Sequence, residues 1–299
     1  MKNILSLCDG ISGAQLALKR AKIKYDNYFA SEIDDDAISI TTHNFPNTKQ
    51  IGDITNINPK KLPKIFLLIA GSPCQDFSMA GKRKGMITSD NIEITSLNQY
   101  INLKKKNHKF HGQSFLFWET VHLIKTLKPK YFIVENVRMN NKWKYIFSKE
   151  LGVLPLTINS NVLSIQNRER YYWTNIKMPP LKPKNIPLSN VIPNAIGGFG
   201  TRGRFDILTK KYIQHPTTRS DNKINCITTK KGNTGKVKLK NGTTRSLTIT
   251  EAELAQTLPK NYTKVPGISE TKRWHGIGNG FTIDVVTHIL KGIKKDLDK

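Results

Sequence analysis

The stretch Ile65-Phe66-Leu67-Leu68-Ile69-Ala70, followed directly by Gly71-Ser72-Pro73-Cys74-Gln75, decides the fold. Its apolar run contains no alternating polar positions, which is typical of a strand buried on both faces of a parallel sheet. Comparable apolar runs occur at 3–8, 28–31 and 131–134, with helical stretches between them. This alternation predicts an α/β fold built on a mostly parallel, doubly wound sheet.

Ligands in such sheets bind beyond the carboxyl ends of the strands. Polar or glycine-containing segments follow the predicted strands at Asp9–Gly13, Glu32, Asp53, Ser72–Gln75 and Glu135-Asn136. The first of these is a tight glycine turn, and an acidic residue follows Gly10 by 22 positions, a spacing that commonly serves a ribose. The pattern suits an adenosine ligand but does not choose between a dinucleotide and S-adenosylmethionine, and a plain structural turn is the alternative.

The charge balance points to a polyanionic partner. The chain has 299 residues, with 48 Lys and Arg against 22 Asp and Glu, a formal net charge of +26. Such a field attracts nucleic acid, although a lysine-rich composition alone would also produce it. The three cysteines form no CxxC pair, so neither a disulfide framework nor a cysteine-based zinc site is expected.

A change of amino-acid composition near residue 178 predicts two domains. Residues 1–177 would form the larger domain, completed by a C-terminal helical part at about 270–299. Prolines, then the Gly197–Gly203 cluster and a Thr/Lys/Gly-rich stretch, predict a small, loop-rich, β-leaning domain at 178–269.

Several residues at the predicted sheet edge could carry chemistry. Cys74 follows a proline that rigidifies the turn, Glu135 ends a strand, and Arg168 and Arg170 are two apart on an extended segment, so they would share a face. Taken singly, each has a structural alternative. Cys74 could be an inert core cysteine, Glu135 an ion-pair partner, and the two arginines part of a solvated charged face.

Together, and in this order, the segments resemble the DNA (cytosine-5) methyltransferase family, and most closely its phage and bacterial members. The matching segments are SLCDGISG (6–13), ASEID (30–34), GDI (52–54), GSPCQDFS (71–78), SFLFWE (114–119), ENV (135–137), QNRERYYW (166–173), TRSLTITEAELAQTLP (244–259) and GNGFTIDVVTHI (278–289). The resemblance implies a Rossmann-like S-adenosylmethionine-dependent methyltransferase fold with a small β-rich target-recognition domain.

The resemblance also implies catalytic roles. Cys74 would add to C6 of cytosine, since C5 is too weak a nucleophile to take a methyl group unaided. Glu135 would contact N3 and the exocyclic amine, Arg170 would hold O2, and Arg168 would support that network. A base not evident in the sequence would then remove the C5 proton.

The cofactor implied by the resemblance is S-adenosylmethionine, with S-adenosylhomocysteine as product. Glu32 would hold the ribose hydroxyls, and Asp53 would accept a hydrogen bond from the adenine amine. Asp9, Gly10 and Gly13 would line the methionine end, and Ile33 would lie against the adenine. The other expected pocket residues are Ile54, which would pack beside Asp53, Leu116, which would complete the pocket, and Ile11, Ser72, Pro73 and Asn279. No metal is expected.

Double-stranded DNA is the expected partner, and the target base would have to leave the duplex to reach the thiol. The expected DNA contacts are Gln75, Lys82, Arg83 and Lys84 after the nucleophile, and Phe199, Arg202, Arg204, Thr228 and Thr229 in the recognition domain, where the Gly197–Gly203 cluster is predicted to be a flexible loop. The short domain suggests a target of about four base pairs. The role of the long segment 86–112 stays open; packing near the DNA backbone and a solvated excursion are the alternatives.

Two other functions remain open on the sequence: a tRNA cytosine-5 methyltransferase and a catalytically silent DNA-binding protein. A nicotinamide enzyme is disfavoured because the full GxGxxG pattern is absent. We expect a monomer in the cytoplasm of a bacterium or phage-infected cell, with no membrane association. The sequence leaves open whether a cognate restriction endonuclease accompanies it.

Overall fold

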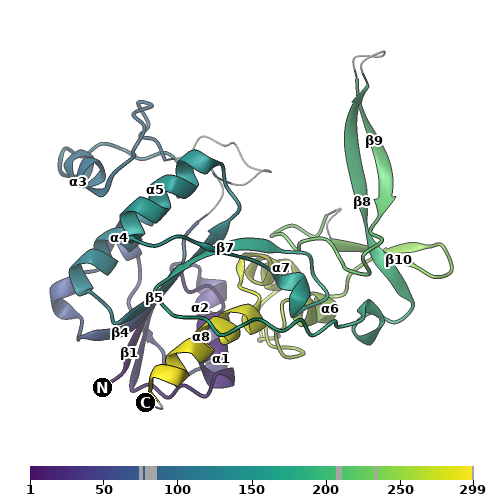
Figure 1. Ribbon diagram of the computed structural model, residues 1–299, viewed down its shortest axis with the longest axis horizontal. Helices are drawn as coiled ribbons and strands as arrows, with labels where there is room; N and C mark the ends of the chain where they lie inside the picture. The colour runs from purple at the N-terminus through teal and green to yellow at the C-terminus, as the bar shows by residue number, and fades with distance from the viewer. Residues whose placement is uncertain (74–76, 78–85, 207–210, 233–234, 298–299) are drawn as a thin grey trace. The chain divides into compact units, whose positions relative to one another are not determined.

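The computed structural model describes residues 1–73, 77, 86–206, 211–232 and 235–297, with the backbone alone for 202–206, 211–214 and 295–297. The chain divides into two compact units, and the colour in Figure 1, which marks residue number, locates the residues of each. The first unit comprises residues 1–158, 169–179 and 289–299, and the second comprises 159–168 and 180–288.

A seven-stranded sheet of order β3-β2-β1-β4-β5-β7-β6 forms the centre of the first unit. Its strands are β1 Asn3–Leu7, β2 Asn27–Ser31, β3 Lys49–Gln50, β4 Ile65–Gly71, β5 Tyr131–Val137, β6 Leu156–Asn159 and β7 Glu169–Thr174. Neighbouring strands from β3 to β5 run parallel, and β7 is antiparallel to β5. The predicted mostly parallel α/β sheet is confirmed.

Helices cover both faces of this sheet. The α-helices of this unit are α1 Gly13–Arg20, α2 Asp35–Asn44, α3 Leu97–Lys105, α4 Leu116–Leu127, α5 Asn141–Leu151 and the later part of α8 Ile283–Leu297. Two short 3-10 helices, η1 Ile54–Asn56 and η2 Pro59–Lys61, precede β4. Figure 1 shows α4 and α5 on one side of the sheet and α1 and α2 on the other.

The strand residues explain why both faces need a cover. Leu5 and Leu68 belong to one apolar cluster with Phe147 of α5, and all three side chains are fully buried. Their neighbours Ile4 and Leu67 are equally buried, and they point to the opposite face because side chains alternate along a strand. The continuous apolar runs of the sequence are therefore strands with two dry faces.

The segment 86–112, whose role the sequence left open, folds against the first unit. Ser96 begins α3, and its hydroxyl accepts a hydrogen bond from the Gln99 amide at 3.3 Å. Met86, Ile94 and Tyr100 are buried in the same apolar cluster as α4 and α5. This segment is therefore a folded part of the first unit, held there by its own buried hydrophobic side chains.

The second unit is built on an antiparallel sheet of order β11-β10-β8-β9. Its elements are η3 Ser160–Val162, η4 Leu188–Asn190, β8 Ala195–Asp206, β9 Lys211–Thr218, β10 Lys236–Leu239, β11 Thr244–Ser246, α6 Ile249–Ala255, α7 Glu270–Asn279 and the start of α8. Strand β10 pairs with β8 only between Ala195 and Phe199, whereas β9 pairs with it as far as Asp206. Beyond β10 the two strands continue as a long ribbon, which is plain in Figure 1.

The prediction of a flexible loop at Gly197–Gly203 is wrong, because the whole cluster lies within β8. A Cβ on Gly197 would lie 2.2 Å from the Arg219 carbonyl oxygen, and one on Gly198 would lie 2.7 Å from the Asn225 amide nitrogen. These glycines allow close packing of backbones instead of supplying flexibility.

The sequence predicted a catalytic and cofactor-binding domain at 1–177 with 270–299, and a target-recognition domain at 178–269. This assignment of roles to the two parts of the chain stays a prediction. By their contacts, residues 159–168 and the stretch 270–288, which includes α7, group with the second unit.

Candidate functional site

The candidate site lies at the carboxyl edge of the large sheet, within the first unit. Strands β1, β2, β4 and β5 are parallel neighbours, so their carboxyl ends meet at one edge. Asp9, Glu32 and Ser72 follow the first three of these strands, and Glu135 lies near the end of β5. The structure thus gathers Asp9, Glu32, Ser72 and Glu135 of the residues predicted for this edge, while Cys74 and Gln75 lie outside the described residues.

The turn between β1 and α1 holds a buried carboxylate. Cys8, Gly10 and Ser12 all adopt left-handed backbone conformations, with φ of 51°, 57° and 57°. Asp9 is 6% exposed; Tyr28 donates to its Oδ1 at 2.6 Å, while its Oδ2 has no hydrogen-bond partner within the described part of the chain. Burial, aided by the charge of Glu32, raises the Asp9 pKa from 3.8 to about 6.

Glu32 faces this turn from the end of β2. Its Oε2 accepts from the Gly10 amide at 2.7 Å, and its Oε1 accepts from the amides of Ile33 and Asp34 at 2.8 and 3.0 Å. These three backbone donors fix the carboxylate in place. The adjacent Ile33 side chain is 64% exposed, an unusual position for a large apolar group.

Asp53 and Leu116 complete this corner. The Asp53 Oδ1 accepts from the Thr55 amide at 2.8 Å and so begins η1, whose first residue, Ile54, is buried. Leu116 is the first residue of α4 and is half-buried. Contacts between η1 and α4 bring these two segments together.

Three features of this corner fit a ligand with an ammonium group and a flat apolar ring. The Asp9 Oδ2 is a buried acceptor without a donor among the described residues. A Cβ on Gly10 would meet nothing within 4 Å, so the turn is open on that side. Ile33 offers an uncovered apolar surface beside the Glu32 carboxylate.

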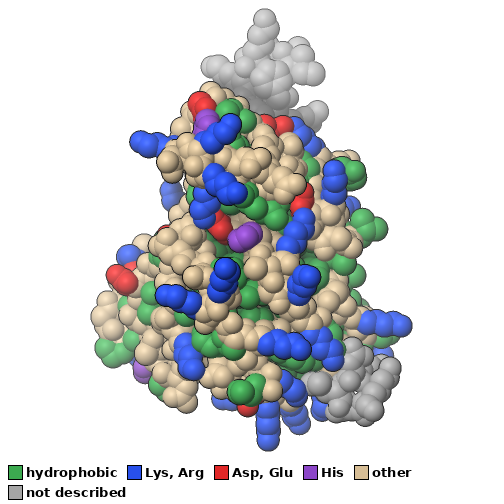
Figure 2. All heavy atoms as spheres, turned by 90° about the vertical axis from the view of Figure 1, so that its left-hand side faces the viewer, with side chains coloured by type: hydrophobic (Ala, Val, Ile, Leu, Met, Phe, Trp, Pro, Cys, Tyr) green, Lys and Arg blue, Asp and Glu red, His purple; other side chains and the backbone are tan. Residues whose placement is uncertain are grey.

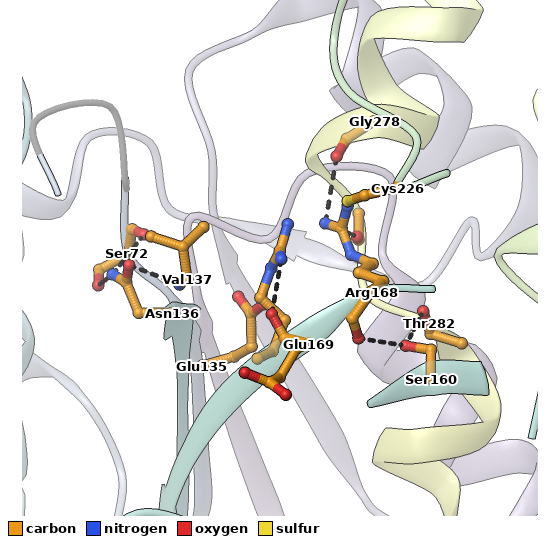
Figure 3. Close-up of polar contacts among 12 residues, drawn as sticks. Ser72, Glu135, Asn136, Val137, Ser160, Arg168, Glu169, Cys226, Gly278 and Thr282 are labelled. Atoms are coloured by element: carbon orange, nitrogen blue, oxygen red, sulfur yellow. Dashed lines mark hydrogen bonds and ion pairs between the residues drawn. The ribbon is translucent and has the colours of Figure 1, made fainter. Parts of the chain in front are cut away.

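The ends of β4 and β5 are tied together by Asn136. Its buried side-chain amide donates to the Ser72 carbonyl at 3.1 Å and to the Ser72 hydroxyl at 2.9 Å, as Figure 3 shows. Its Oδ1 accepts from the Val137 amide at 2.8 Å. Asn136 therefore fixes the backbone just before Cys74, which itself lies outside the described residues.

Glu135 and Arg170 form an ion pair at the same edge. The Arg170 Nε lies 3.2 Å from the Glu135 Oε1, and the two side chains are 14% and 12% exposed. Arg170 also donates to the Glu169 carbonyl at 2.8 Å. Arg170 pairs with Val137 in the β5–β7 ladder, so Glu135 is its diagonal neighbour on one face. A largely desolvated carboxylate and guanidinium thus lie side by side.

Arg168 has a different environment, although it is only two residues away. It belongs to the second unit, is 4% exposed, and donates to the carbonyls of Ile227, Gly278 and Gly280 at 2.9, 3.2 and 3.0 Å. A further contact reaches the Cys226 Sγ at 3.4 Å. Arg168 thus holds three segments of the second unit together, and its guanidinium has partners other than those of Arg170.

The protein-family model for C-5 cytosine-specific DNA methylases matches this sequence at residues 2–177 and 155–295. The chain belongs to this family.

Curated relatives of this chain include phage and bacterial methyltransferases. The orphan methyltransferase M.SPRI of Bacillus phage SPR is 32% identical over 192 residues, which are 60% of this chain and 38% of the relative. M.Rho11sI of Bacillus phage rho11s is similar, and the match spans 33% of its length. The type II methyltransferase M1.ScrFI of Lactococcus lactis subsp. cremoris is 25% identical over 99% of this chain and 79% of its own length. The chain therefore spans well under half of the two phage relatives.

Solved structures show the same fold at low identity. S. pombe Dnmt2 has a TM-score of 0.67 at 14% identity, covering 100% of this chain and 99% of its own. A putative DNA modification methyltransferase encoded within an E. coli prophage has a TM-score of 0.62 at 18% identity, covering both chains fully. The predicted methyltransferase fold is confirmed, with a mostly parallel sheet and a second, antiparallel one.

The residues expected to contact DNA in a C-5 methylase are described only in part. Gln75, Lys82, Arg83 and Lys84 lie outside the described residues, and Arg202 and Arg204 are described by their backbone in β8 alone. Phe199 is half-buried at the base of the β8–β9 ribbon. Thr228 is exposed, and its carbonyl accepts from the Trp274 Nε1 at 2.9 Å; Thr229 is half-buried.

Of the predicted cofactor residues, Asn279 alone belongs to the second unit. It is the exposed last residue of α7, and its side-chain amide lies 3.4 Å from the His275 Nε2. Ile11 and Gly13 are buried in the β1–α1 turn of the first unit, beside Asp9.

Sequence reasoning missed Tyr28, which donates to Asp9 from β2. The sequence did contain a sign of this contact, because a tyrosine inside an apolar strand needs a hydrogen-bond partner for its hydroxyl. In the part of the chain that the structure describes, no group of three or more His, Cys, Asp or Glu is arranged to hold a metal. None of the described helices is long and apolar enough to cross a bilayer.

Proposed function

We propose that this member of the C-5 cytosine methylase family transfers the methyl group of S-adenosylmethionine to C5 of a flipped-out cytosine in double-stranded DNA, with Cys74 as nucleophile. The observation that carries this proposal is the Glu135–Arg170 pair. It places one acidic and one basic group, 3.2 Å apart, at the sheet edge where β4 leads into Cys74. The edge of a cytosine that carries N3 and O2 needs this combination.

The chemistry requires the base to be activated first. A thiolate adding to C6 moves electron density to C5, where a carbanion-like centre can then attack an electrophilic methyl group. In this proposal the Cys74 sulfur forms the bond to C6. That bond breaks when water or hydroxide takes the C5 proton, and the electron pair of the C–S bond leaves with the thiolate. S-adenosylmethionine supplies the methyl group as an electrophile on a sulfonium sulfur.

Glu135 and Arg170 would make this addition possible. In its ion pair with Arg170, Glu135 is a carboxylate, so in this proposal it takes up a proton before it donates to N3. The donated hydrogen bond draws electrons from the ring as the thiolate adds. Arg170 donates to O2 and stabilises the charge that develops there. Arg168 acts from a distance in this scheme, because its guanidinium is committed to the backbone carbonyls of the second unit.

The cofactor would occupy the corner formed by the β1–α1 turn, Glu32, Asp53 and Leu116. Ionised Asp9 accepts from the ammonium of the methionine end, which gives its unpartnered Oδ2 a donor. Glu32 accepts from a ribose hydroxyl at Oε2, which has a single amide contact, whereas Oε1 already accepts from two amides. Ile33 packs on the adenine.

Double-stranded DNA is the proposed partner. Lysine and arginine side chains are spread over the face drawn in Figure 2, with few acidic ones between them, in keeping with the net charge of +26. A two-stranded ribbon such as β8–β9 has the width that the major groove admits. We propose that its residues, Arg202 and Arg204 among them, read the target sequence.

The test is methyl transfer from radiolabelled S-adenosylmethionine to duplex DNA, with tRNA as a parallel substrate. We expect label in DNA with the unaltered chain and none with Cys74→Ser, while both proteins bind the cofactor equally. Label in tRNA alone would keep the chemistry and replace the substrate. An active Cys74→Ser variant would remove the thiol from its role.

A further inference from the structure

The segment 86–112 carries a polar network that reaches the cofactor corner. Tyr100 and Lys104 lie one turn apart on α3, and both contact Glu119 of α4. The Tyr100 hydroxyl donates to the Glu119 Oε1 at 2.5 Å, and the Lys104 ammonium makes an ion pair with the same oxygen. Glu119 and Tyr100 are buried, so this carboxylate depends on α3 for its partners.

Lys104 has a second contact that links α3 to η1. Its ammonium donates to the Thr55 carbonyl oxygen at 3.4 Å. The amide of Thr55 donates in turn to the Asp53 Oδ1 at 2.8 Å. One residue of η1 is thus held from both sides, by Lys104 at its carbonyl and by Asp53 at its amide.

The position of Glu119 extends this link to α4. Glu119 is three residues after Leu116, and residues three apart lie on the same side of a helix. Two segments of the predicted cofactor pocket, Asp53-Ile54 and Leu116, are therefore joined by one lysine and one carboxylate. Stacking of Phe110 on Phe115, with ring centroids 4.8 Å apart, adds an apolar contact between segment 86–112 and the residue that precedes α4.

We propose that Lys104 is a positioning residue of the cofactor site, which sets the separation of η1 and α4 by bridging Thr55 and Glu119. The inference rests on the proposed function, since it assumes that this corner binds S-adenosylmethionine. It also gives segment 86–112 a role in cofactor affinity that is independent of any contact with DNA. Removing the bridge lets η1 move, and the adenine amine then loses a well-placed Asp53.

The experiment compares Lys104→Met with Lys105→Met, the neighbouring exposed lysine of α3. Both variants remove one positive charge, so any general electrostatic effect on the binding of DNA or cofactor is the same. We expect Lys104→Met to raise the Kd and KM for S-adenosylmethionine roughly three- to fivefold with kcat unchanged, as befits one partly exposed ion pair. Lys105→Met should leave both values as they were, and Lys104→Arg should restore most of the affinity.

Amide hydrogen exchange of residues 54–57 without cofactor gives a second readout. We expect faster exchange there in Lys104→Met and not in Lys105→Met, because the Thr55 and Asn56 amides are held within η1. Faster exchange with unchanged cofactor affinity would overturn the positioning role, and so would equal behaviour of the two variants. Failure of the unaltered protein to bind S-adenosylmethionine would instead overturn the proposed function, and the exchange data would still show whether the bridge exists.

Discussion

Glu135 is the residue whose protonation the mechanism needs, so it is the most informative single change at the sheet edge. Glu135→Gln keeps the size of the side chain and an oxygen for Arg170, but it cannot exchange a proton with N3. We expect kcat to fall by about 10² or more. Initial rates of methyl transfer to duplex DNA check this, and cofactor binding should be unchanged.

Glu169→Gln is the matched control, because Glu169 is on the neighbouring strand and its carboxylate pairs with Arg138 at 3.0 Å, away from Glu135. We expect it to keep near-normal activity. Equal losses in the two variants would mean that Glu135 contributes only general charge.

Asp9 should make cofactor binding depend on pH. Its folded-state pKa of about 6 lies above the ordinary 3.8, because burial disfavours the charged form. Its contribution to stability is therefore complete below pH about 4 and is lost as the pH rises through 6. The ionised form is the one that accepts from an ammonium, so affinity for S-adenosylmethionine should increase as the pH rises through about 6.

Calorimetry between about pH 5 and 8 measures both effects. Asp9→Asn should bind the cofactor weakly and without this pH dependence, and its Tm at pH about 7.5 should exceed that of the unaltered protein. A pH profile that persists in Asp9→Asn would assign the titration to another group.

At the scale of elements, glycines fix how the strands of the second unit pack. A Cβ on Gly198 would lie 2.9 Å from the Ile224 Cα, inside backbone that cannot move aside cheaply. We expect Gly198→Ala to lower the free energy of unfolding by roughly 1–3 kcal/mol. Gly232→Ala, where an added Cβ meets nothing within 4 Å, should change it by less than about 0.5 kcal/mol. Denaturant unfolding compares the two, and equal effects would contradict the packing argument.

The strands of the first unit could be predicted where they form continuous runs of apolar residues in the sequence. The strand at 65–71 and its neighbours show continuous apolar runs, and the polar residues after them mark the site. The β8–β9 ribbon was missed because glycines indicate both flexible loops and close backbone approach, and only the partner strand decides between them. The Tyr100–Glu119–Lys104 network was missed because its members are up to 19 residues apart and lie on two helices.

At the scale of the whole molecule, the charge of +26 should govern how the protein meets DNA. Binding to non-specific duplex should weaken as salt rises, with log K falling by about 0.9 per phosphate contact for each unit of log salt concentration. Fluorescence anisotropy over a salt series measures the slope. A slope near zero would show that the basic residues make no phosphate contacts.

The most direct test of the central claim is bisulfite sequencing of mixed-sequence duplex DNA after incubation with the protein and S-adenosylmethionine. We predict 5-methylcytosine confined to one short motif, present with the unaltered protein and absent with Cys74→Ser. Unmethylated DNA, from a protein that is folded and binds the cofactor, would contradict it.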